Sequence, residues 1–544
     1  MVEKDLQSIS CDVLVIGSGA AGLRAAIEAR RLGARVLVIS KSTTGGANCT
    51  LISGGGFRAA IEGLSEEDHY RLSMEVGRGV NDQRLVRRLV TEAPSKVLEL
   101  ETMGMRAVKI PGELFCFGRP FVWGLDILLT LKRFASEIGV EFSPHTFAVE
   151  LLSDGGKIIG ALVYQSKQKE MLVIVSGAIV LASGGVGGLF ERSDNPATIS
   201  GDGYALAYRV GACLKDMEFV QFFPIAIMDG RRRARIIPPL LLDVGRLQNW
   251  KGEDLLKKYD IRDQPVAIVA RDRLSQLIYQ ESSREEGGPG WALLDLTCLK
   301  DSDWKINPLA ETVEELMKKK YKADQAPIRI SPASHHTMGG VVIDEEGATT
   351  ASGLFAAGEV AGGVHGANRM GGNALTETLV FGARAGTSAA RYAMGKEPKL
   401  SQLEALLSHS EILRDQKPSG NELHHEDFLE MRKTLERLLW EKAGIIRTAE
   451  GLEEGLTKLD EVDQRLKEGT SIFSSESVVK RMKLVNAVCV SRMIMESALR
   501  REESRGAHFR SDYPAMDDRK WLGSYSIQRS DEKMEFQFLK QNER

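Results

Sequence analysis

The stretch Cys11-Asp-Val-Leu-Val-Ile-Gly-Ser-Gly-Ala-Ala-Gly22 decides the fold of this chain. Its apolar run predicts a buried strand, after which Gly17, Gly19 and Gly22 follow as Gly-x-Gly-x-x-Gly. The first glycine permits a tight turn, the second lets the backbone approach a pyrophosphate, and the third lets the next helix pack on the strand. Because the N-terminus of that helix faces the phosphate charge, we predict a dinucleotide-binding turn.

The residues that follow continue the same strand–turn–helix–strand unit. Leu23 to Leu32 has helical spacing, and Arg35-Val-Leu-Val-Ile39 is a second apolar run. This order opens a parallel sheet, so we predict the α/β class with a Rossmann-like dinucleotide-binding domain. The position that usually holds an acid in NAD-binding proteins carries Ser40 and then Lys41, which weakens an NAD interpretation. Ser40 can still bind a ribose hydroxyl, or it can simply end the strand.

A second glycine-rich passage lies far along the chain: Gly353-Leu-Phe-Ala-Ala-Gly-Glu-Val-Ala-Gly-Gly-Val-His-Gly-Ala-Asn-Arg-Met-Gly-Gly-Asn-Ala-Leu375. In it, Glu359 stands beside a glycine, as Asp202 does in Ser200-Gly-Asp-Gly203. Such carboxylates can reach a ribose or ribityl hydroxyl, although each can also be an ordinary turn residue. The glycine-rich loop from Ser42 to Phe57 can wrap the same cofactor, the alternative being a surface loop. Together these passages predict one flavin site built from distant parts of the chain.

Size and composition bound the class of protein. A chain of 544 residues is too long for one simple core, so we expect roughly two to four domains. The net charge of −3 argues against a nucleic-acid partner held by broad electrostatics. The six cysteines are scattered without any Cys-x-x-Cys, which predicts neither a metal ligand set nor an iron–sulfur cluster in this chain and fits a reducing compartment.

One uncharged stretch, Met171 to Leu189, is long enough to suggest a membrane-spanning helix. It is rich in Val and Ile, however, and it breaks at Ser183-Gly-Gly and again at Gly187-Gly188. We therefore interpret it as a buried strand followed by a turn against the cofactor, and we expect no membrane span. The N-terminus shows no apolar stretch before the first strand, so we expect no cleavable signal.

The sequence changes character along its length, which indicates separate units. We expect a discontinuous FAD-binding domain over residues 1–235 and 345–400, because both glycine-rich passages need the same cofactor. Between its parts we expect an inserted α+β capping domain over residues 236–344. A helical domain is expected over residues 401–510, followed by a polar tail over residues 511–544 that we place on the surface.

These passages resemble the flavoprotein subunit of succinate dehydrogenases and fumarate reductases, and the related L-aspartate oxidases. The resemblance covers nearly the whole chain. Its motifs are Gly17-Ser-Gly-Ala-Ala-Gly22, Ser200-Gly-Asp-Gly203, Ala270-Arg-Asp272, His335-His-Thr-Met-Gly-Gly340, His365-Gly-Ala-Asn-Arg-Met370 and Arg501-Glu-Glu-Ser-Arg-Gly-Ala-His508.

The resemblance implies roles for three catalytic residues. In that family a hydride passes between flavin N5 and one carbon of a dicarboxylate, while an arginine moves the proton at the neighbouring carbon; the matching position is Arg271. The positions of the family's carboxylate binders are His335 and Arg369, and an arginine can grip a carboxylate in a bidentate fork. The alternatives are a salt bridge for Arg271 and a core or turn role for His335.

Two departures from the family pattern concern the substrate and the flavin. Many members read Gln-Phe-His-Pro-Thr where this chain reads Gln221-Phe-Phe-Pro-Ile225, so Phe223 and Ile225 cannot bind a carboxylate. Leu240-Leu-Leu-Asp-Val-Gly245 stands where the family has a Thr-Glu-containing substrate segment. The substrate is therefore expected to have one carboxylate in the usual place or an apolar end, with fumarate still open. Cys49 occupies the position of the flavin-linked histidine, so we predict non-covalent FAD, with a thioether at Cys49 as the alternative.

The predicted function is FAD-dependent oxidation or reduction of a small carboxylate, with fumarate and succinate as the first candidates. The alternatives are an L-aspartate oxidase, and a flavin electron-transfer subunit with an altered substrate pocket. Electrons would reach the chain from an iron–sulfur subunit or a soluble carrier. The expected location is the cytoplasm, or the inner membrane face through a partner. The candidate cofactor-binding residues are Gly17, Gly19, Ala20, Ala21, Gly22, Ser40, Lys41, Gly46, Cys49, Gly55, Gly56, Asp202, Glu359, Asn373, Ala374 and Leu375.

Overall fold

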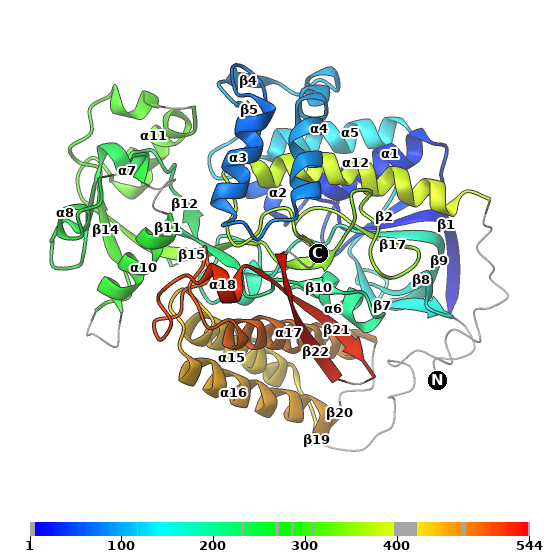
Figure 1. Cartoon of the computed structure of the whole chain (residues 1–544). Coiled ribbons are helices and arrows are strands. Elements are labelled where there is room, and N and C mark those ends of the chain that lie inside the picture. The colour runs from blue at the N-terminus through cyan, green and yellow to red at the C-terminus, as the bar shows by residue number, and fades with distance from the viewer. Residues whose placement is uncertain are drawn as a thin grey trace.

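The computed structural model describes residues 6–116, 118–230, 233–262, 264–266, 271–283, 288–306, 308–395, 421–470, 475–531 and 533–541. Its central element is a seven-stranded sheet in the order β6-β2-β1-β9-β8-β7, with β17 beside β9 (Figure 1). The strands are β1 (Gln7–Ile16), β2 (Val36–Ser40), β6 (Glu141–Pro144), β7 (Thr146–Asp154), β8 (Lys157–Gln165), β9 (Glu170–Leu181) and β17 (Leu354–Ala356).

The apolar runs of the sequence form the parallel centre of this sheet. Val13 of β1 pairs with Val36 of β2 on one side and with Ala178 of β9 on the other, all three strands running parallel. The predicted strand–turn–helix–strand unit is confirmed. The uncharged stretch from Met171 forms most of β9, which pairs antiparallel with β8 before the chain turns. None of the helices in the described part of the chain is both long and apolar enough to cross a bilayer.

Helices cover one face of the sheet and bring the second glycine-rich passage to the first (Figure 1). Helix α1 packs directly on α12, because Gly382 and Gly386 of α12 leave room for its backbone. A Cβ added at these glycines would lie 2.8 Å from the carbonyl oxygen of Ala21 and 2.1 Å from that of Ala25. The helices of this part are α1 (Ala20–Arg31), α3 (Glu66–Val76), α4 (Gln83–Thr102), α5 (Leu125–Glu137), α6 (Asp202–Arg209) and α12 (Asn373–Ala393).

A second sheet has five strands in the order β12-β11-β15-β14-β13 and its own apolar core around Leu274 and Trp304. Its strands are β11 (Val220–Ile227), β12 (Arg235–Ile236), β13 (Arg246–Gln248), β14 (Ala292–Asp295) and β15 (Ile328–Thr337). The helices around it are α7 (Leu241–Val244), α8 (Leu255–Lys258), α10 (Arg271–Ser282) and α11 (Pro308–Tyr321). This part extends from the central sheet at the left of Figure 1.

The C-terminal part begins with helices and ends in strands. Helices α15 (His425–Lys442), α16 (Ala449–Glu468) and α17 (Ser475–Arg500) pack together beneath the central sheet in Figure 1. Residues 511–520 are exposed, as expected of a surface tail, but the chain then continues into two strands. Strands β21 (Gly523–Ser530) and β22 (Lys533–Lys540) form a hairpin that completes a sheet in the order β18-β16-β10-β21-β22. The polar sequence gives little sign of β21, because its buried residues include Ser524 beside Tyr525 and Ile527 and its last three residues are polar and more exposed.

The other strands of that sheet are β10 (Leu214–Lys215), β16 (Gly340–Val342) and β18 (Ala361–Gly362). A small sheet of three strands, in the order β3-β5-β4, lies beside the N-terminus of α12. Its strands are β3 (Gly56–Arg58), β4 (Ala107–Ile110) and β5 (Glu113–Cys116), and the short helix α2 (Cys49–Ile52) precedes β3 in the loop from Ser42 to Phe57.

Candidate active site

The turn between β1 and α1 has the geometry that its glycines predict. Gly17 has a φ of +120°, and a Cβ at this position would lie 2.1 Å from the carbonyl oxygen of Ala182, so only glycine fits. A Cβ at Gly22 would lie 2.0 Å from the carbonyl oxygen of Gly17. Gly19 caps α1 without any side-chain hydrogen bond. The N-terminus of α1 therefore faces the neighbouring cavity without a capping side chain from its own N-cap residue.

The second glycine-rich passage meets this turn directly. Gly358 has a φ of +73°, and a Cβ there would lie 2.8 Å from the Cβ of Ala21. Glu359 follows, and its carboxylate accepts a hydrogen bond of 3.0 Å from the N–H of Thr337. Burial raises the pKa of Glu359 to about 7. The two distant passages thus form one wall, as the sequence predicts.

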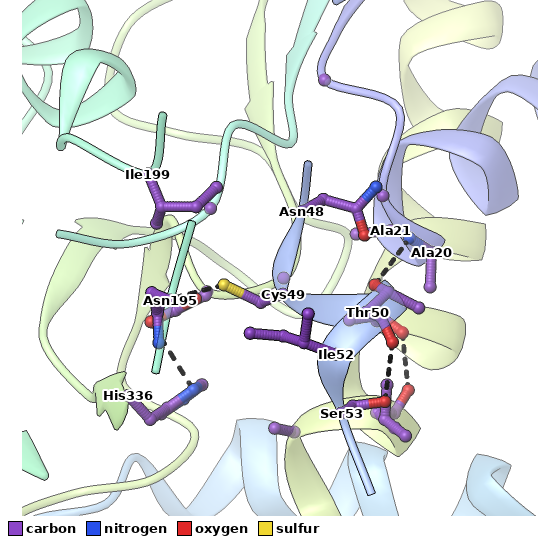
Figure 2. Close-up of a pocket in the computed structure, with 18 of the residues that line it drawn as sticks. Ala20, Ala21, Asn48, Cys49, Thr50, Ile52, Ser53, Asn195, Ile199 and His336 are labelled. Carbon is purple, nitrogen blue, oxygen red and sulfur yellow. Dashed lines mark hydrogen bonds and ion pairs between the residues drawn. The ribbon is translucent and has the colours of Figure 1, made fainter. Parts of the chain in front are cut away.

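The loop after β2 closes the wall beside the turn. The Thr50 hydroxyl accepts a hydrogen bond of 3.1 Å from the N–H of Ala20. Asn48 caps α2 by accepting from the N–H of Leu51 at 3.0 Å. Figure 2 shows the sulfur of Cys49 pointing toward Asn195, whose side-chain amide oxygen accepts from the thiol at 3.0 Å. The loop is an ordered part of the site rather than a surface loop.

These elements enclose a cavity of about 420 Å³ that runs from the glycine turn to Arg271, His335 and Arg369. Its wall includes thirteen of the sixteen candidate cofactor residues: Gly17, Gly19, Ala20, Ala21, Ser40, Lys41, Gly46, Cys49, Gly56, Asp202, Glu359, Ala374 and Leu375. The remaining three do not line it. Gly22 packs α1 on the turn, Gly55 lies against Cys116, and the Asn373 side chain bonds His69 and Ser73 instead.

Two of the cavity-lining candidates hold each other. The Lys41 ammonium is hydrogen-bonded to the Asp202 carboxylate and, at 2.7 Å, to the carbonyl oxygen of Thr198. The other carboxylate oxygen of Asp202 accepts from Asn486 of α17 at 2.8 Å. The Ser40 hydroxyl donates to the carbonyl of Ser42 at 2.9 Å. These contacts fix the end of β2 against α6 and the C-terminal helices.

Arg271, His335 and Arg369, hereafter the cation cluster, meet at the far end of the cavity, where the second sheet faces the first. Arg271 begins α10, His335 lies near the end of β15, and Arg369 lies within the second glycine-rich passage. Both guanidiniums are buried, with exposed fractions of 8% and 7%. The Nε atoms of both have no hydrogen-bond partner among the described residues. Unpartnered buried donors of this kind call for an anion.

The cation cluster is oriented by side chains that the sequence alone did not single out. Gln221 accepts from Arg369 Nη2 at 2.9 Å and donates to the carbonyl of Arg369 at 3.1 Å. Asp194 lies 2.6 Å from Nδ1 of His335, and Asn195 donates to the His335 carbonyl at 2.9 Å. No local motif marks Asp194 or Asn195. Only Gln221 could have been found from the sequence, because it belongs to the segment Gln221-Phe-Phe-Pro-Ile225 that occupies the position of the family's substrate-binding motif.

The electrostatics of this end follow from burial. Burial lowers the pKa of Arg369 to about 9, and the nearby charge of Arg271 adds to the effect. Burial also lowers the pKa of Arg271 and that of His335, the latter against the opposing influence of Asp194. Because an ionised Asp194 can only accept, Nδ1 of a neutral His335 carries the proton and Nε2 is left as an acceptor. His336, on the opposite side of β15, has a pKa well below the usual range because it is buried.

The cavity fits FAD on grounds of shape and donors. Its turn admits a pyrophosphate where a Cβ would be excluded, a helix N-terminus faces it, and it extends on to an anion-binding end. Sequence comparison agrees: the model of the FAD binding domain family matches residues 12–375. The model of the fumarate reductase flavoprotein C-terminal family matches residues 432–542. Fold and site therefore define an FAD-dependent oxidoreductase.

Relatives narrow this class to a family. The chain is 34% identical to one of the subunits of the fumarate reductase (CoM/CoB) of Methanothermobacter marburgensis, over 97% of this chain and 98% of that protein. It is 30% identical to the L-aspartate oxidase of Streptomyces coelicolor, over 94% of this chain and 90% of that protein. The structure matches the quinol fumarate reductase FrdA of E. coli with a TM-score of 0.87 and 26% identity, covering 98% and 97% of the two chains. The chain belongs to the succinate dehydrogenase and fumarate reductase flavoprotein family, as predicted.

The glycine turn gives the first prediction. Gly17→Ala places a methyl group against the backbone of Ala182 and strains a positive φ, so the purified variant should lose most of its FAD. Ser18→Ala, in the same turn, removes only the hydrogen bond from the N–H of Gly45 and should keep the flavin. The measurement is the ratio of flavin to protein absorbance after gel filtration. A fully loaded Gly17→Ala protein would refute the assignment of this turn to the cofactor.

Proposed function

We propose that this chain, as a flavoprotein subunit, reduces the carbon–carbon double bond of a small carboxylate or oxidises the corresponding saturated acid, with fumarate and succinate as the first pair to test. The observation that carries the proposal is the convergence of two buried guanidiniums and His335 on the cavity end opposite the glycine turn. Bound FAD would supply the two-electron redox chemistry. The chain itself must bind the anion, orient it and move one proton.

Each member of the cation cluster suits one of these tasks. Arg369 is clamped by Gln221, which leaves its buried Nε free to donate to a carboxylate. Arg271 opens α10 from the second sheet, and burial lowers its pKa, which eases loss of a proton from a guanidinium. We assign Arg271 to proton transfer at the carbon beside the one that exchanges hydride. Because α10 packs on the second sheet whereas the glycine turn belongs to the first, both parts are needed to complete the site.

The presence of the cation cluster also helps to decide between the alternative functions. A flavin protein with a decayed substrate pocket has no need for two buried guanidiniums, each costly to desolvate without an anion. An L-aspartate oxidase is supported by the similarity to the Streptomyces protein. An L-aspartate oxidase would be distinguished by its electron donor, because L-aspartate would bleach the flavin. In air, the reaction would then form peroxide steadily.

Electron supply is assigned to a second component. The scattered cysteines offer no cluster-binding pattern, and the related Methanothermobacter protein is named as a subunit. We propose that an iron–sulfur subunit or a soluble carrier exchanges electrons with the bound FAD.

The decisive prediction concerns Arg271. Anaerobic holoprotein whose flavin has been photoreduced should be reoxidised by fumarate, with loss of about three orders of magnitude or more in rate for Arg271→Ala. The variant should keep its flavin, because Arg271 lies at the end of the cavity away from the glycine turn. Arg391→Ala, on the last turn of α12, is the matched control. Stopped-flow absorbance is the measurement, and unchanged reoxidation in Arg271→Ala would remove this residue from the mechanism.

The state of His335 predicts a pH dependence of binding. A neutral His335 offers a lone pair at Nε2, so a bound carboxylate there must be accompanied by uptake of a proton. Because the free protein holds the pKa of His335 low, affinity for acetate should rise as pH falls from 8 toward 6, by about tenfold per unit at most. His335→Gln, whose amide donates without titrating, should bind with a flat profile. Flavin difference spectra measure the affinities; a flat wild-type profile contradicts this state of His335.

We also propose that the FAD is non-covalent. Cys49 stands at the wall of the cavity, but burial raises the pKa of its thiol well above the usual range, and the thiol is held against Asn195. A protonated thiol is a poor nucleophile. Acid precipitation of the holoprotein should therefore leave all the flavin in the supernatant, equally for wild type and for Cys49→Ala. Flavin that stays with the wild-type pellet alone would show a thioether at Cys49.

A further inference from the structure

Phe223 belongs to the apolar core of the second sheet and also contacts the cation cluster. Its ring centroid lies 5.5 Å from that of His335, and the Arg271 guanidinium lies over the same ring at 5.7 Å. Both Phe223 and Ile225 belong to the core of the second sheet, but only Phe223 lines the cavity. An aromatic ring therefore contacts two of the three groups that would bind substrate.

The cavity wall also includes a run of apolar residues on the elements that pack around Phe223. Its side chains on this side are Ile236, Pro238, Pro239, Leu240 and Leu309. The two prolines have no N–H to offer. The N–H groups of residues 241 to 243 donate to carbonyls within the same segment, each at 3.1 Å. The apolar side chains, the two prolines and the N–H groups of residues 241 to 243 are therefore not available to bind a carboxylate.

The charges around the cavity lead to the same conclusion. Lys41 is paired with Asp202, and Arg58 is paired with Glu113 at 2.5 Å. At the far end, the two buried guanidiniums of the cation cluster each keep an Nε atom without a hydrogen-bond partner among the described residues. One carboxylate on the substrate can accept from these donors. A second carboxylate would lie against Phe223 and the prolines with no partner, which costs binding.

We propose that the substrate of this site is a 2-enoic monocarboxylate, or its saturated counterpart, with an apolar group at the end where fumarate carries a second carboxylate, and that Phe223 is the residue that sets this specificity. This inference rests on the reaction type proposed above and narrows its substrate class. Arg369 and Arg271 hold the one carboxylate and deliver a proton, and the apolar end packs on Phe223 and on the segment from Ile236 to Leu240. The double bond gains one hydride, from reduced FAD, and one proton, so atoms and electrons balance.

The test compares acids that differ at that end alone. Crotonate carries a methyl group where fumarate carries its second carboxylate, and butyrate is related to succinate in the same way. Dissociation constants for butyrate and succinate come from perturbation of the oxidised flavin spectrum, which does not depend on turnover. Reoxidation of photoreduced flavin by crotonate and fumarate gives the matching rates. Both ratios are measured for wild type, for Phe223→His, which restores a polar donor, and for Phe223→Leu, which keeps an apolar wall.

Wild type should bind butyrate about tenfold or more tightly than succinate. Phe223→His should shift both ratios by about tenfold or more toward the dicarboxylate, whereas Phe223→Leu should leave them near those of wild type. Comparing ratios between variants cancels the greater intrinsic reactivity of fumarate. Tighter binding of succinate by wild type, or unchanged ratios in Phe223→His, would overturn the specificity while leaving the reaction type standing. Flavin-loaded protein that neither binds nor reduces any of the four acids would instead refute the proposed function and this inference with it.

Discussion

The close approach of Gly17 to the backbone of Ala182 is the constraint on which the rest of this structure depends. With a Cβ at Gly17, β1 and β9 could not end side by side, because the added atom would stand 2.1 Å from a carbonyl oxygen. The same crowding recurs where Gly22 meets Gly17 and where Gly358 meets Ala21. Three backbone segments thus converge at one point, and the cavity opens where their missing side chains leave room. The cofactor site therefore exists because glycine lets these backbone segments pack so closely.

At the opposite end the cavity is shaped by charge. The backbone before Arg369 is held in place by the turn from Arg505 to His508, which packs against Ala367. The N–H of Ala507 donates to the carbonyl of Ala367 at 3.0 Å, and a Cβ at Gly506 would stand 2.4 Å from that oxygen. The C-terminal helical part therefore supports the substrate end of the cavity, although none of its described residues lines the cation cluster.

The turn from Arg505 to His508 is in turn held by buried ion pairs. Arg501 contacts Glu218 at 2.7 Å and Glu503 at 3.0 Å, with all three side chains buried. A buried pair adds little net stability, but loss of one partner leaves an uncompensated charge that costs about 3–5 kcal/mol. The cluster thus fixes geometry more than it adds stability, since no alternative arrangement would satisfy these charges. The motif from Arg501 to His508, recognised in the sequence, is explained by this structural role and not by contact with substrate.

The sequence determined the dinucleotide turn, the parallel strands and the cofactor wall, because each depends on neighbouring residues or on glycine where no side chain fits. It also indicated Arg271, His335 and Arg369, but only through likeness to a family. Tertiary structure alone decided that Phe223 contacts both Arg271 and His335, that Asp194 and Gln221 orient the cluster, and that Asn373 faces away from the cavity. It also turned the polar tail into the hairpin of β21 and β22. These contacts join residues that are remote along the chain, so no local periodicity, propensity or spacing encodes them; they exist only once two sheets and a helical layer are packed together.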